Sequence, residues 1–256
     1  MKIREYEKEL SEEVLGEKYK KEFDHKVSKE VMESFEAYMQ ADHCLEIGCY
    51  DGSVTSLLIN HYKNVTALDA SKDAIIKTTK KIPSETSVLL INQRIEDFLN
   101  NPKINNKANI FEDIMDIYFM NIIEHLDNPE NVLSTLNKKL QVGSKLFIQV
   151  PNVDSLSRRI ASMMGILETT DKISEFEWNC GHRNNYSFDS MDNLIRKSGF
   201  KIITSFGRGL KTLSSAQLDQ AQELGLIEEA YIEALFELDQ ILPSLAGSIC
   251  YVAEKS

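Results

Sequence analysis

The sequence lacks the apolar runs of a membrane protein and the cysteine pattern of a disulfide-bonded extracellular protein. No apolar run approaches the roughly 18 residues that a membrane-spanning helix needs, and the first ten residues, MKIREYEKEL, have no apolar core. The four cysteines form no CxxC pair, which argues against a disulfide framework and a structural zinc site; they are Cys44, Cys49, Cys180 and Cys250. We therefore expect a cytoplasmic protein with reduced thiols and no membrane partner.

Positive charge is also scarce. Lysine and arginine together number 29 against 40 aspartates and glutamates, which gives a formal net charge of −11. Nucleic acid and anionic membranes both attract a basic surface, so this charge predicts that neither is a partner. With 42% hydrophobic and 27% charged residues, the 256-residue chain is typical of a globular protein. We expect one domain over residues 1–256, in which residues 1–23 form a flexible or helical N-terminal extension.

Buried strands and amphipathic helices alternate along the chain. The predicted strands cover residues 43–48, 64–70, 87–92, 114–120, 145–150, 200–206 and 247–253. The predicted helices cover residues 24–40, 52–61, 71–81, 127–140, 155–165, 187–199 and 214–240, and residues 100–108 form a loop. Strands that alternate with helices of this length form right-handed βαβ units, which predicts an α/β fold with a largely parallel sheet.

A glycine-containing turn follows the first predicted strand, in the segment LEIGCYDGS at residues 45–53, and Asp69 ends the second strand. A strand, a glycine turn and a helix form a nucleotide cradle, in which an acid about 20 residues later accepts the ribose hydroxyls. The third glycine of a dinucleotide site is missing, and Glu46 and Asp51 place acid on both sides of the turn. This disfavours the pyrophosphate of a nicotinamide-dependent dehydrogenase and favours a cationic ligand such as a sulfonium. A plain strand–helix turn is the alternative.

The LEIGCYDGS segment with Asp69 resembles the first two motifs of the class I S-adenosylmethionine-dependent methyltransferases. IEDF at 95–98 is similar to their adenine-contacting segment, and NIIEHLDNP at 121–129 to their "LEHLxDP" motif. VPN at 150–152 followed by SLSRR at 155–159 resembles a small-molecule branch that includes sugar, natural-product and phosphonate methyltransferases. The resemblance implies a Rossmann-like seven-stranded sheet in the order 3-2-1-4-5-7-6, with the last strand antiparallel and a helical lid inserted at 155–186 over the acceptor.

The resemblance also implies the cofactor, S-adenosylmethionine, and the residues that contact it. Asp69 would hold the ribose, Ala70 would lie under the adenine, and the backbone N–H of Ile95 would face the adenine ring. The full set is Glu46, Gly48, Cys49, Gly52, Asp69, Ala70, Ile95, Glu96 and Asn121. Two positions depart from the family pattern. Tyr50 replaces a middle glycine, and Arg94 stands where many members carry an acid, a role that Glu96 or backbone carbonyls could take over.

Two histidines are candidates for the base that receives the acceptor's proton. His125 follows the fourth predicted strand, where ligands lie in open α/β sheets, and the ordinary pKa of histidine suits this role at neutral pH. His182 lies in GHRNNY at 181–186, within the insertion. Helix packing for His125 and an ordinary polar loop for His182 are the alternatives. Tyr186 could orient either histidine or pack as a hydrophobic staple.

The insertion also carries candidate acceptor-binding groups. Arg158, Arg159 and Arg183 could clamp a carboxylate or phosphate, although a solvated helix face explains them as well. Met163 and Met164, with the single tryptophan Trp178, could form the apolar core of a lid. Glu124 and His125 with Asp127 could form a metal site, but Asp127 is better suited to cap the following helix, so no metal is expected.

These features predict in-line methyl transfer from S-adenosylmethionine to oxygen or nitrogen of a small polar acceptor. A sugar, a nucleotide-sugar or an anionic metabolite, such as a phosphonate or a natural-product intermediate, is the expected substrate. A non-catalytic S-adenosylmethionine-binding scaffold and a nucleic-acid methyltransferase are the alternatives. The helix at 214–240 could pack on its own domain or form a homodimer.

Overall fold

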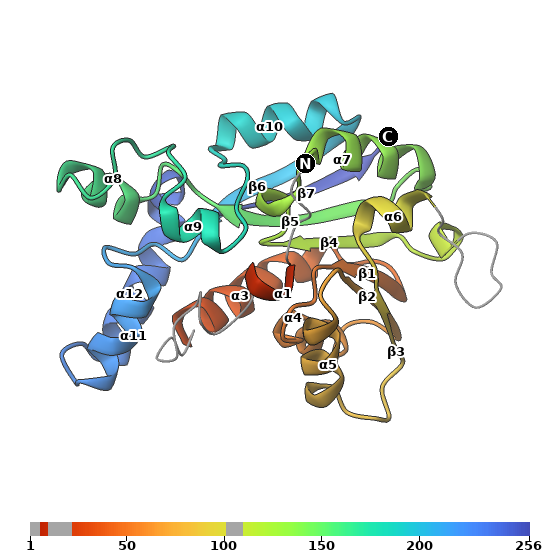
Figure 1. The fold of residues 1–256 in the computed structure, drawn as a ribbon, viewed down its shortest axis with the longest axis horizontal. Helices are drawn as coiled ribbons and strands as arrows, with labels where there is room; N and C mark the ends of the chain where they lie inside the picture. The colour runs from red at the N-terminus through yellow and green to blue at the C-terminus, as the bar shows by residue number, and fades with distance from the viewer. Residues whose placement is uncertain (1–5, 10–21, 101–109) are drawn as a thin grey trace.

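A seven-stranded sheet runs through the protein in the computed structural model, which describes residues 6–9, 22–100 and 110–256 (Figure 1). The strands are β1 (His43–Ile47), β2 (Asn64–Asp69), β3 (Val88–Asn92), β4 (Asp116–Met120), β5 (Lys145–Pro151), β6 (Phe200–Arg208) and β7 (Ser248–Lys255). Their order is β3-β2-β1-β4-β5-β7-β6, as predicted. The first five strands are parallel, and β7 pairs antiparallel with both β5 and β6.

Helices cover both faces of this sheet (Figure 1). On one face lie α6 (Ile95–Asn100), α7 (Pro129–Lys139) and α10 (Phe188–Lys197). On the other lie α3 (Glu22–Phe35), α4 (Ser53–Leu58) and α5 (Lys72–Lys81), with α11 (Ser215–Glu223) against α3. The remaining helices are α1 (Tyr6–Glu9), α8 (Leu156–Met163), α9 (Glu175–Asn179) and α12 (Glu229–Ile241). The fold is therefore the three-layered α/β architecture that the alternation of elements predicts.

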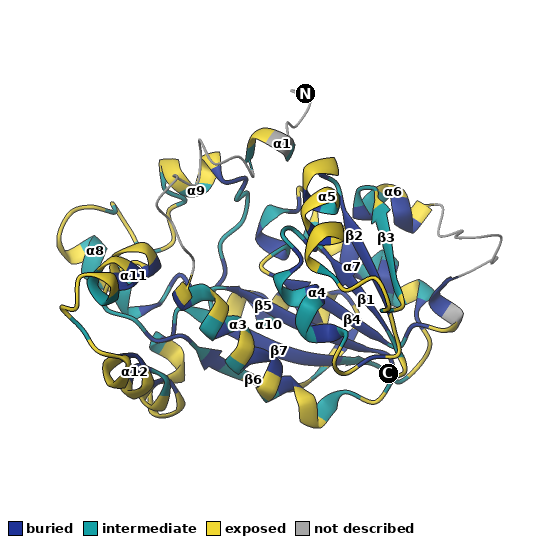
Figure 2. Ribbon diagram, turned by 90° about the horizontal axis from the view of Figure 1, so that it is seen from below, coloured by how far each residue is buried: buried dark blue, intermediate teal, exposed yellow. Residues whose placement is uncertain are grey.

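Each face of the sheet has its own apolar core, because successive side chains of a strand point to opposite sides. In β4, Ile117 and Phe119 belong to the cluster under α6, α7 and α10, whereas Tyr118 belongs to the cluster with α3. The strands in the middle of the sheet are buried on both faces, whereas α12 presents mostly exposed residues and α8 has no buried residue (Figure 2). This burial explains why the strand segments read as continuous apolar runs.

Several predicted boundaries need correction. The helix expected at 214–240 is two helices, because Gly225 takes a left-handed conformation (φ 66°) that ends α11. Asn128, not Asp127, caps α7: its side chain accepts a hydrogen bond from the N–H of Asn131 at 3.0 Å. The short α9 was not predicted. The expected helix at 24–40 is α-helical only as far as Phe35 and ends in a 3-10 turn.

Most of the predicted N-terminal extension and most of the loop at 100–108 lie outside the described residues. Across the parts of the chain that the structure describes, no helix combines the length and the apolar character needed to cross a bilayer. All four cysteines are buried, and no disulfide joins any two of them; they are Cys44, Cys49, Cys180 and Cys250.

Candidate functional site

The carboxyl ends of five parallel strands meet at one edge of the sheet, and the loops that follow them form the candidate site. The loop after β1 begins at Gly48, whose N–H donates to the Leu68 carbonyl at 2.7 Å. Gly48 has a φ of 83°, and a Cβ there would lie 2.5 Å from Cδ1 of Ile122. Glycine at this position therefore allows the loop after β4 to lie directly against the loop after β1.

Asp69, at the end of β2, is 8% exposed and holds this loop in place. Its Oδ2 accepts a hydrogen bond from the N–H of Tyr50 at 2.9 Å, and its Oδ1 accepts one from the N–H of Ser71 at 2.8 Å. These two bonds fix the Asp69 carboxylate at the carboxyl edge of the sheet, beside the glycine loop.

Tyr50 adopts a left-handed φ of 48°, the conformation that its neighbours Gly48 and Gly52 also adopt. Its ring lies toward α5, with Nζ of Lys77 at 5.7 Å from the ring centroid. The tyrosine therefore keeps the turn that a glycine would make, at the cost of a conformation that is uncommon for a residue with a side chain. Gly52 also needs to be glycine, because a Cβ at this position would lie only 3.0 Å from Cα of Thr78 in α5.

Glu46, on β1, is 1% exposed beneath the loop. Its Oε2 accepts a hydrogen bond from the Thr55 hydroxyl at 2.6 Å, and its Oε1 has no hydrogen-bond partner among the described residues. Burial raises the pKa of Glu46 to about 8, with a further contribution from the negative charges of Asp69 and Asp51.

The structure gives Cys49 and Ala70 less direct roles. The Cys49 sulfur is buried against α5 and accepts a hydrogen bond from Thr78 at 3.4 Å, and burial raises the pKa of this thiol. The Ala70 carbonyl accepts a hydrogen bond from Nδ2 of Asn92 at 3.1 Å. Only the backbone of Cys49 is therefore available to a ligand at the sheet edge.

The end of β3 carries an arginine–glutamate pair. A guanidinium nitrogen of Arg94 lies 3.4 Å from Oε1 of Glu96 and 4.0 Å from Oδ2 of Asp127. The Arg94 guanidinium also lies 5.8 Å from the ring centroid of Tyr6 in α1. Ile95 is the first residue of α6, so its N–H has no intrahelical acceptor and can face a ligand.

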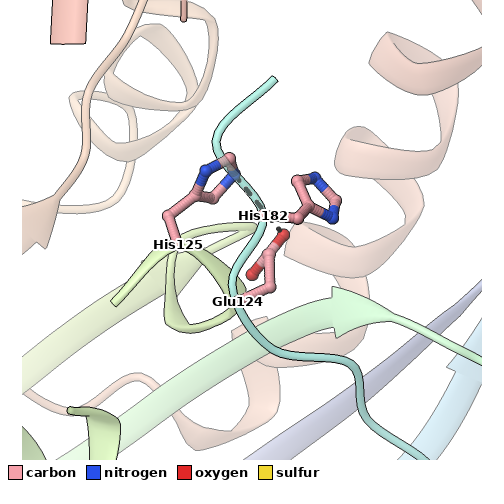
Figure 3. A group of neighbouring side chains, drawn as sticks. All are labelled: Glu124, His125 and His182. Atoms are coloured by element: carbon pink, nitrogen blue, oxygen red, sulfur yellow. Dashed lines mark ion pairs between the residues drawn. The ribbon is translucent and has the colours of Figure 1, made fainter. Parts of the chain in front are cut away.

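The loop after β4 brings three ionisable side chains together. Asn121 is exposed, has a φ of 54° and donates its N–H to the Gln149 carbonyl at 2.8 Å. A 3-10 turn at Ile123–His125 follows it. Figure 3 shows Glu124 and His125 on this turn facing His182, which comes from the segment between α9 and α10. The two imidazole rings lie 4.7 Å apart between centroids, with an interplanar angle of 73°.

Backbone hydrogen bonds explain why these distant residues meet. The N–H groups of Arg183 and Asn184 both donate to the carbonyl oxygen of Glu124, at 2.8 and 3.0 Å. Nδ2 of Asn184 donates to the carbonyl of Leu126 at 2.6 Å. These bonds attach the segment after α9 to the 3-10 turn, and His182 is thereby fixed beside His125.

The environment of this cluster disfavours charge. Burial raises the pKa of Glu124 to about 8 and lowers the pKa of His182. Tyr186 is 6% exposed and packs in the core; its carbonyl accepts a hydrogen bond from the N–H of Val153 at 3.0 Å. Tyr186 therefore packs in the core, and it also interacts electrostatically with Glu124, so its part in the site stays a prediction.

The three arginines do not form an open clamp, because each already pairs with an acid. Arg158 bonds Glu177 and the Thr170 and Lys172 carbonyls, which ties the loop before α9 to α8. Arg159 lies 3.0 Å from Oδ1 of Asp154.

Arg183 bonds Glu9 of α1 at 2.9 Å and lies 4.4 Å from the ring centroid of Trp178. The expected apolar lid core is also absent from the described insertion, since Met163 is 88% exposed, Met164 67% and Trp178 56%.

Residues 17–205, about three quarters of the chain, match a protein family described as a methyltransferase domain. The chain belongs to this methyltransferase family. No curated protein matches the methyltransferase, but its fold occurs in many solved structures. A SAM-dependent methyltransferase from Archaeoglobus fulgidus shares 16% identity at a TM-score of 0.58, over 95% of this chain and 97% of the other.

Two further structures have the same fold. The N-methyltransferase NodS from Bradyrhizobium japonicum, in complex with S-adenosyl-L-homocysteine, shares 12% identity at a TM-score of 0.59, over 98% of this chain and 96% of the other. The plantazolicin methyltransferase BamL, in complex with a desmethylPZN analogue and S-adenosyl-L-homocysteine, shares 16% identity at a TM-score of 0.58. The match covers 95% of this chain and 90% of the other. Family and fold together make the chain an S-adenosylmethionine-dependent methyltransferase.

The residues of the methyltransferase at the sheet edge fit this cofactor. Oε1 of Glu46 is a buried acceptor without a hydrogen-bond partner in the described chain, and the Asp69 carboxylate lies beside the loop. Ile95 begins α6 directly after β3, so its backbone N–H has no intrahelical acceptor. The set thus offers acceptors for an ammonium and for ribose hydroxyls, and a donor for an adenine nitrogen.

Sequence reasoning missed the part of Glu124 in the histidine cluster. It grouped Glu124 and His125 with Asp127, but the structure places His182 beside them instead, while the side chain of Asp127 is about half exposed. The sequence signal for Glu124 is that it lies next to His125 in the NIIEHLDNP segment. An acid beside a histidine is also common in an ordinary 3-10 turn, so this signal does not by itself predict a cluster. Nothing in the spacing of the sequence identifies His182 as the third member.

Proposed function

We propose that the methyltransferase transfers a methyl group to an oxygen or nitrogen atom of a small polar acceptor that binds beside His125 and His182. The observation that supports this proposal is the position of the histidine pair. It follows β4 at the same sheet edge as the glycine loop and Asp69, where an open α/β sheet binds its ligands.

The cofactor half of the proposed site lies after β1, β2 and β3. Glu46 and the backbone of Gly48 would bind the methionine end, Asp69 would bind the ribose, and Ile95 would bind the adenine. Asn121 completes the methionine side after β4. When bound, S-adenosylmethionine supplies a methyl group that is already activated by the positive sulfur. The chain's task is therefore to align the acceptor and to receive its proton.

The acceptor half lies around the histidine pair. Burial lowers the pKa of His182 and so favours its uncharged imidazole. The uncharged ring can accept a proton or a hydrogen bond from the acceptor. The three arginines already pair with acids, so a hydroxyl-bearing sugar or nucleotide-sugar fits the cluster better than an acceptor that needs an unpaired cation. Anionic metabolites, including phosphonates and natural-product intermediates, remain in the substrate class.

The first experiment measures the thermal midpoint with S-adenosylhomocysteine, with NAD and with buffer alone. A ligand at 100 times its dissociation constant stabilises a protein by about 2.7 kcal/mol, which for this size raises the midpoint by roughly 5–10 °C. We expect that shift with S-adenosylhomocysteine and none with NAD. A shift with NAD alone would contradict the proposed cofactor site.

The second experiment measures S-adenosylhomocysteine formation against a panel of sugars, nucleotide-sugars, phosphonates and amines. Turnover of one class supports the proposal. Cofactor binding without turnover on any class would favour a non-catalytic binding protein.

Turnover on RNA or protein alone would contradict the proposal, because the methyltransferase would then act on a macromolecule. One neighbour of the same fold, at 10% identity and a TM-score of 0.60 over 99% of both chains, comes from a complex with the Haloferax volcanii Trm112 methyltransferase activator. The net charge of −11 supports the small-molecule acceptor over a nucleic acid. A cytoplasmic location and a homodimer stay predictions.

A further inference from the structure

We propose that Glu124, His125 and His182 bind a divalent transition-metal ion in the acceptor half of the site. The sequence led us to expect no metal, because the third ligand would have been Asp127. The structure brings a second imidazole to the carboxylate instead. Binding of the ion is independent of the proposed function, whereas its role in methyl transfer rests on that function.

The three side chains lie close enough together to reach one shared ion. Each offers one nitrogen or oxygen atom, and these atoms all lie within 4.8 Å of one another (Figure 3). Zinc–nitrogen and zinc–oxygen distances are about 2.0–2.2 Å, so two ligand atoms of one tetrahedral ion lie about 3.3–3.6 Å apart. Side-chain rotations that bring these atoms closer together by roughly 1–1.5 Å would therefore complete the site.

Buried polar atoms without partners point to a missing cation. The Glu124 side chain is 2% exposed, and neither of its carboxylate oxygens has a hydrogen-bond partner among the described residues. Nδ1 of His182 is buried without a partner in the same part of the chain. Buried polar atoms are nearly always paired, and a metal ion would satisfy both the carboxylate and an imidazole nitrogen.

The positive groups around the cluster do not block a cation. Arg183 follows His182, but its guanidinium pairs with Glu9 and stacks on Trp178. Arg158 also acts on His182 electrostatically, and it pairs with Glu177. Each arginine is thus matched by an acid, and the acid that is left to face the site is Glu124, which would release its proton when a cation binds.

Two imidazoles and one carboxylate are a ligand set typical of zinc, manganese and iron(II), and they leave coordination positions open. An oxygen atom of the acceptor would occupy one open position, where the positive ion lowers the pKa of its hydroxyl. With the ion bound, both imidazoles are ligands, so the hydroxyl would lose its proton to solvent and not to His125 or His182. The acceptor oxygen forms a bond to the methyl carbon as the carbon–sulfur bond breaks, and the electron pair of that bond stays on sulfur.

The test is calorimetric titration of untagged protein, stripped with EDTA and then dialysed, with Zn²⁺ and separately with Mn²⁺. We expect one ion per chain for at least one of these metals. Glu124→Gln and His182→Gln should each weaken binding at least about tenfold, because each removes one of three ligands. His61→Gln is the matched control, since His61 pairs with Glu36 outside the cluster, and it should bind like the wild type.

Binding of S-adenosylhomocysteine to each variant reports whether it is folded, independently of the metal. A variant that fails this check is replaced by His125→Asn, which tests the third ligand. If neither metal binds, or if binding is equal in the wild type and in folded variants, the site does not exist.

Methyl transfer, assayed before and after EDTA, separates this inference from the proposed function. Activity that falls at least about tenfold with EDTA and returns with the metal supports both. Activity that survives EDTA in metal-free protein overturns the role of the metal in methyl transfer and leaves the methyltransferase proposal intact. A bound metal without turnover on any small acceptor overturns the proposed function and leaves the metal site.

Discussion

The Asp69 carboxylate accepts a hydrogen bond from the backbone N–H of Tyr50, across the loop that joins β1 to α4. The acid at the end of β2 therefore has two tasks. It faces the place proposed for the ribose, and it fixes the conformation of the loop that lies beside the methionine end. A change at Asp69 acts on both halves of cofactor binding.

Replacing Asp69 by asparagine should weaken binding of S-adenosylhomocysteine by about 10–100-fold. Hydrogen bonds to charged groups contribute about 1.5–3 kcal/mol, and the amide can accept at only one of its two positions. Calorimetry of the purified variant gives the affinity. Asp73→Asn, an exposed change on α5, serves as the control. Equal affinities in the two variants would remove Asp69 from the cofactor site.

Tyr50 should tolerate glycine better than valine. Its φ of 48° is accessible to glycine without strain, whereas a β-branched side chain there is strongly disfavoured. We expect Tyr50→Val to be less stable than Tyr50→Gly by about 1–3 kcal/mol in urea unfolding. If the two variants were equally stable, the loop would not need the left-handed conformation.

Glu46 should make stability depend on pH. Burial raises its pKa in the folded protein to about 8, above the unfolded value of about 4.3. Between these values the folded state binds a proton that the unfolded state has released. The free energy of unfolding from this group therefore falls as the pH rises from about 4.5 to 8.

The comparison of wild type with Glu46→Gln isolates this effect. The amide of the variant stays neutral at every pH, so only the wild type loses stability as the pH rises. The free energy of unfolding of the variant minus that of the wild type should therefore be about 2–4 kcal/mol larger at pH 8 than at pH 4.5. Urea unfolding of both proteins, without ligand, at four values from pH 4.5 to 8 gives the difference. A difference that stays constant over this range would show that Glu46 is ionised in the fold.

Arg158 should hold the insertion closed, whereas its neighbour Arg159 should not. Arg158 bonds Glu177 and two carbonyls of the loop before α9, and Arg159 bonds only Asp154 close to it in the chain. Loss of a charge-assisted hydrogen bond costs about 1.5–3 kcal/mol, so Arg158→Gln should speed cleavage between 166 and 177 by about tenfold or more. Limited subtilisin digestion measures the rates, with Arg159→Gln as the control. Equal rates would mean that other contacts fix the loop.

The sheet was predictable because its signals are local. Apolar runs such as LFIQV in β5 mark strands that are buried on both faces, and Gly48 and Ser71 mark the turns and the cap that follow them. The strand order came from the family resemblance and is confirmed. The error at 214–240 was also local: Gly225 ends a helix through its positive φ, and an apolar pattern on both sides of it hid that end.

The chemistry of the site was less predictable because it depends on contacts between distant segments. Helical spacing favours exposed arginines on α8, but it does not show that a loop folds back and pairs with Arg158. Likewise, His125 and His182 meet through two N–H groups that donate to one carbonyl, that of Glu124. Such backbone bonds leave no trace in residue type, so the two histidines could be named as candidates but not placed together.

The position of Trp178 gives the protein a built-in optical reporter. It is the single tryptophan of the chain, it is 56% exposed, and its ring lies against Arg183, the residue next to His182. All of the indole fluorescence of the molecule therefore originates beside the acceptor half of the site. Ligands that move the segment after α9 should change the emission wavelength, so acceptor candidates can be screened in solution without a label.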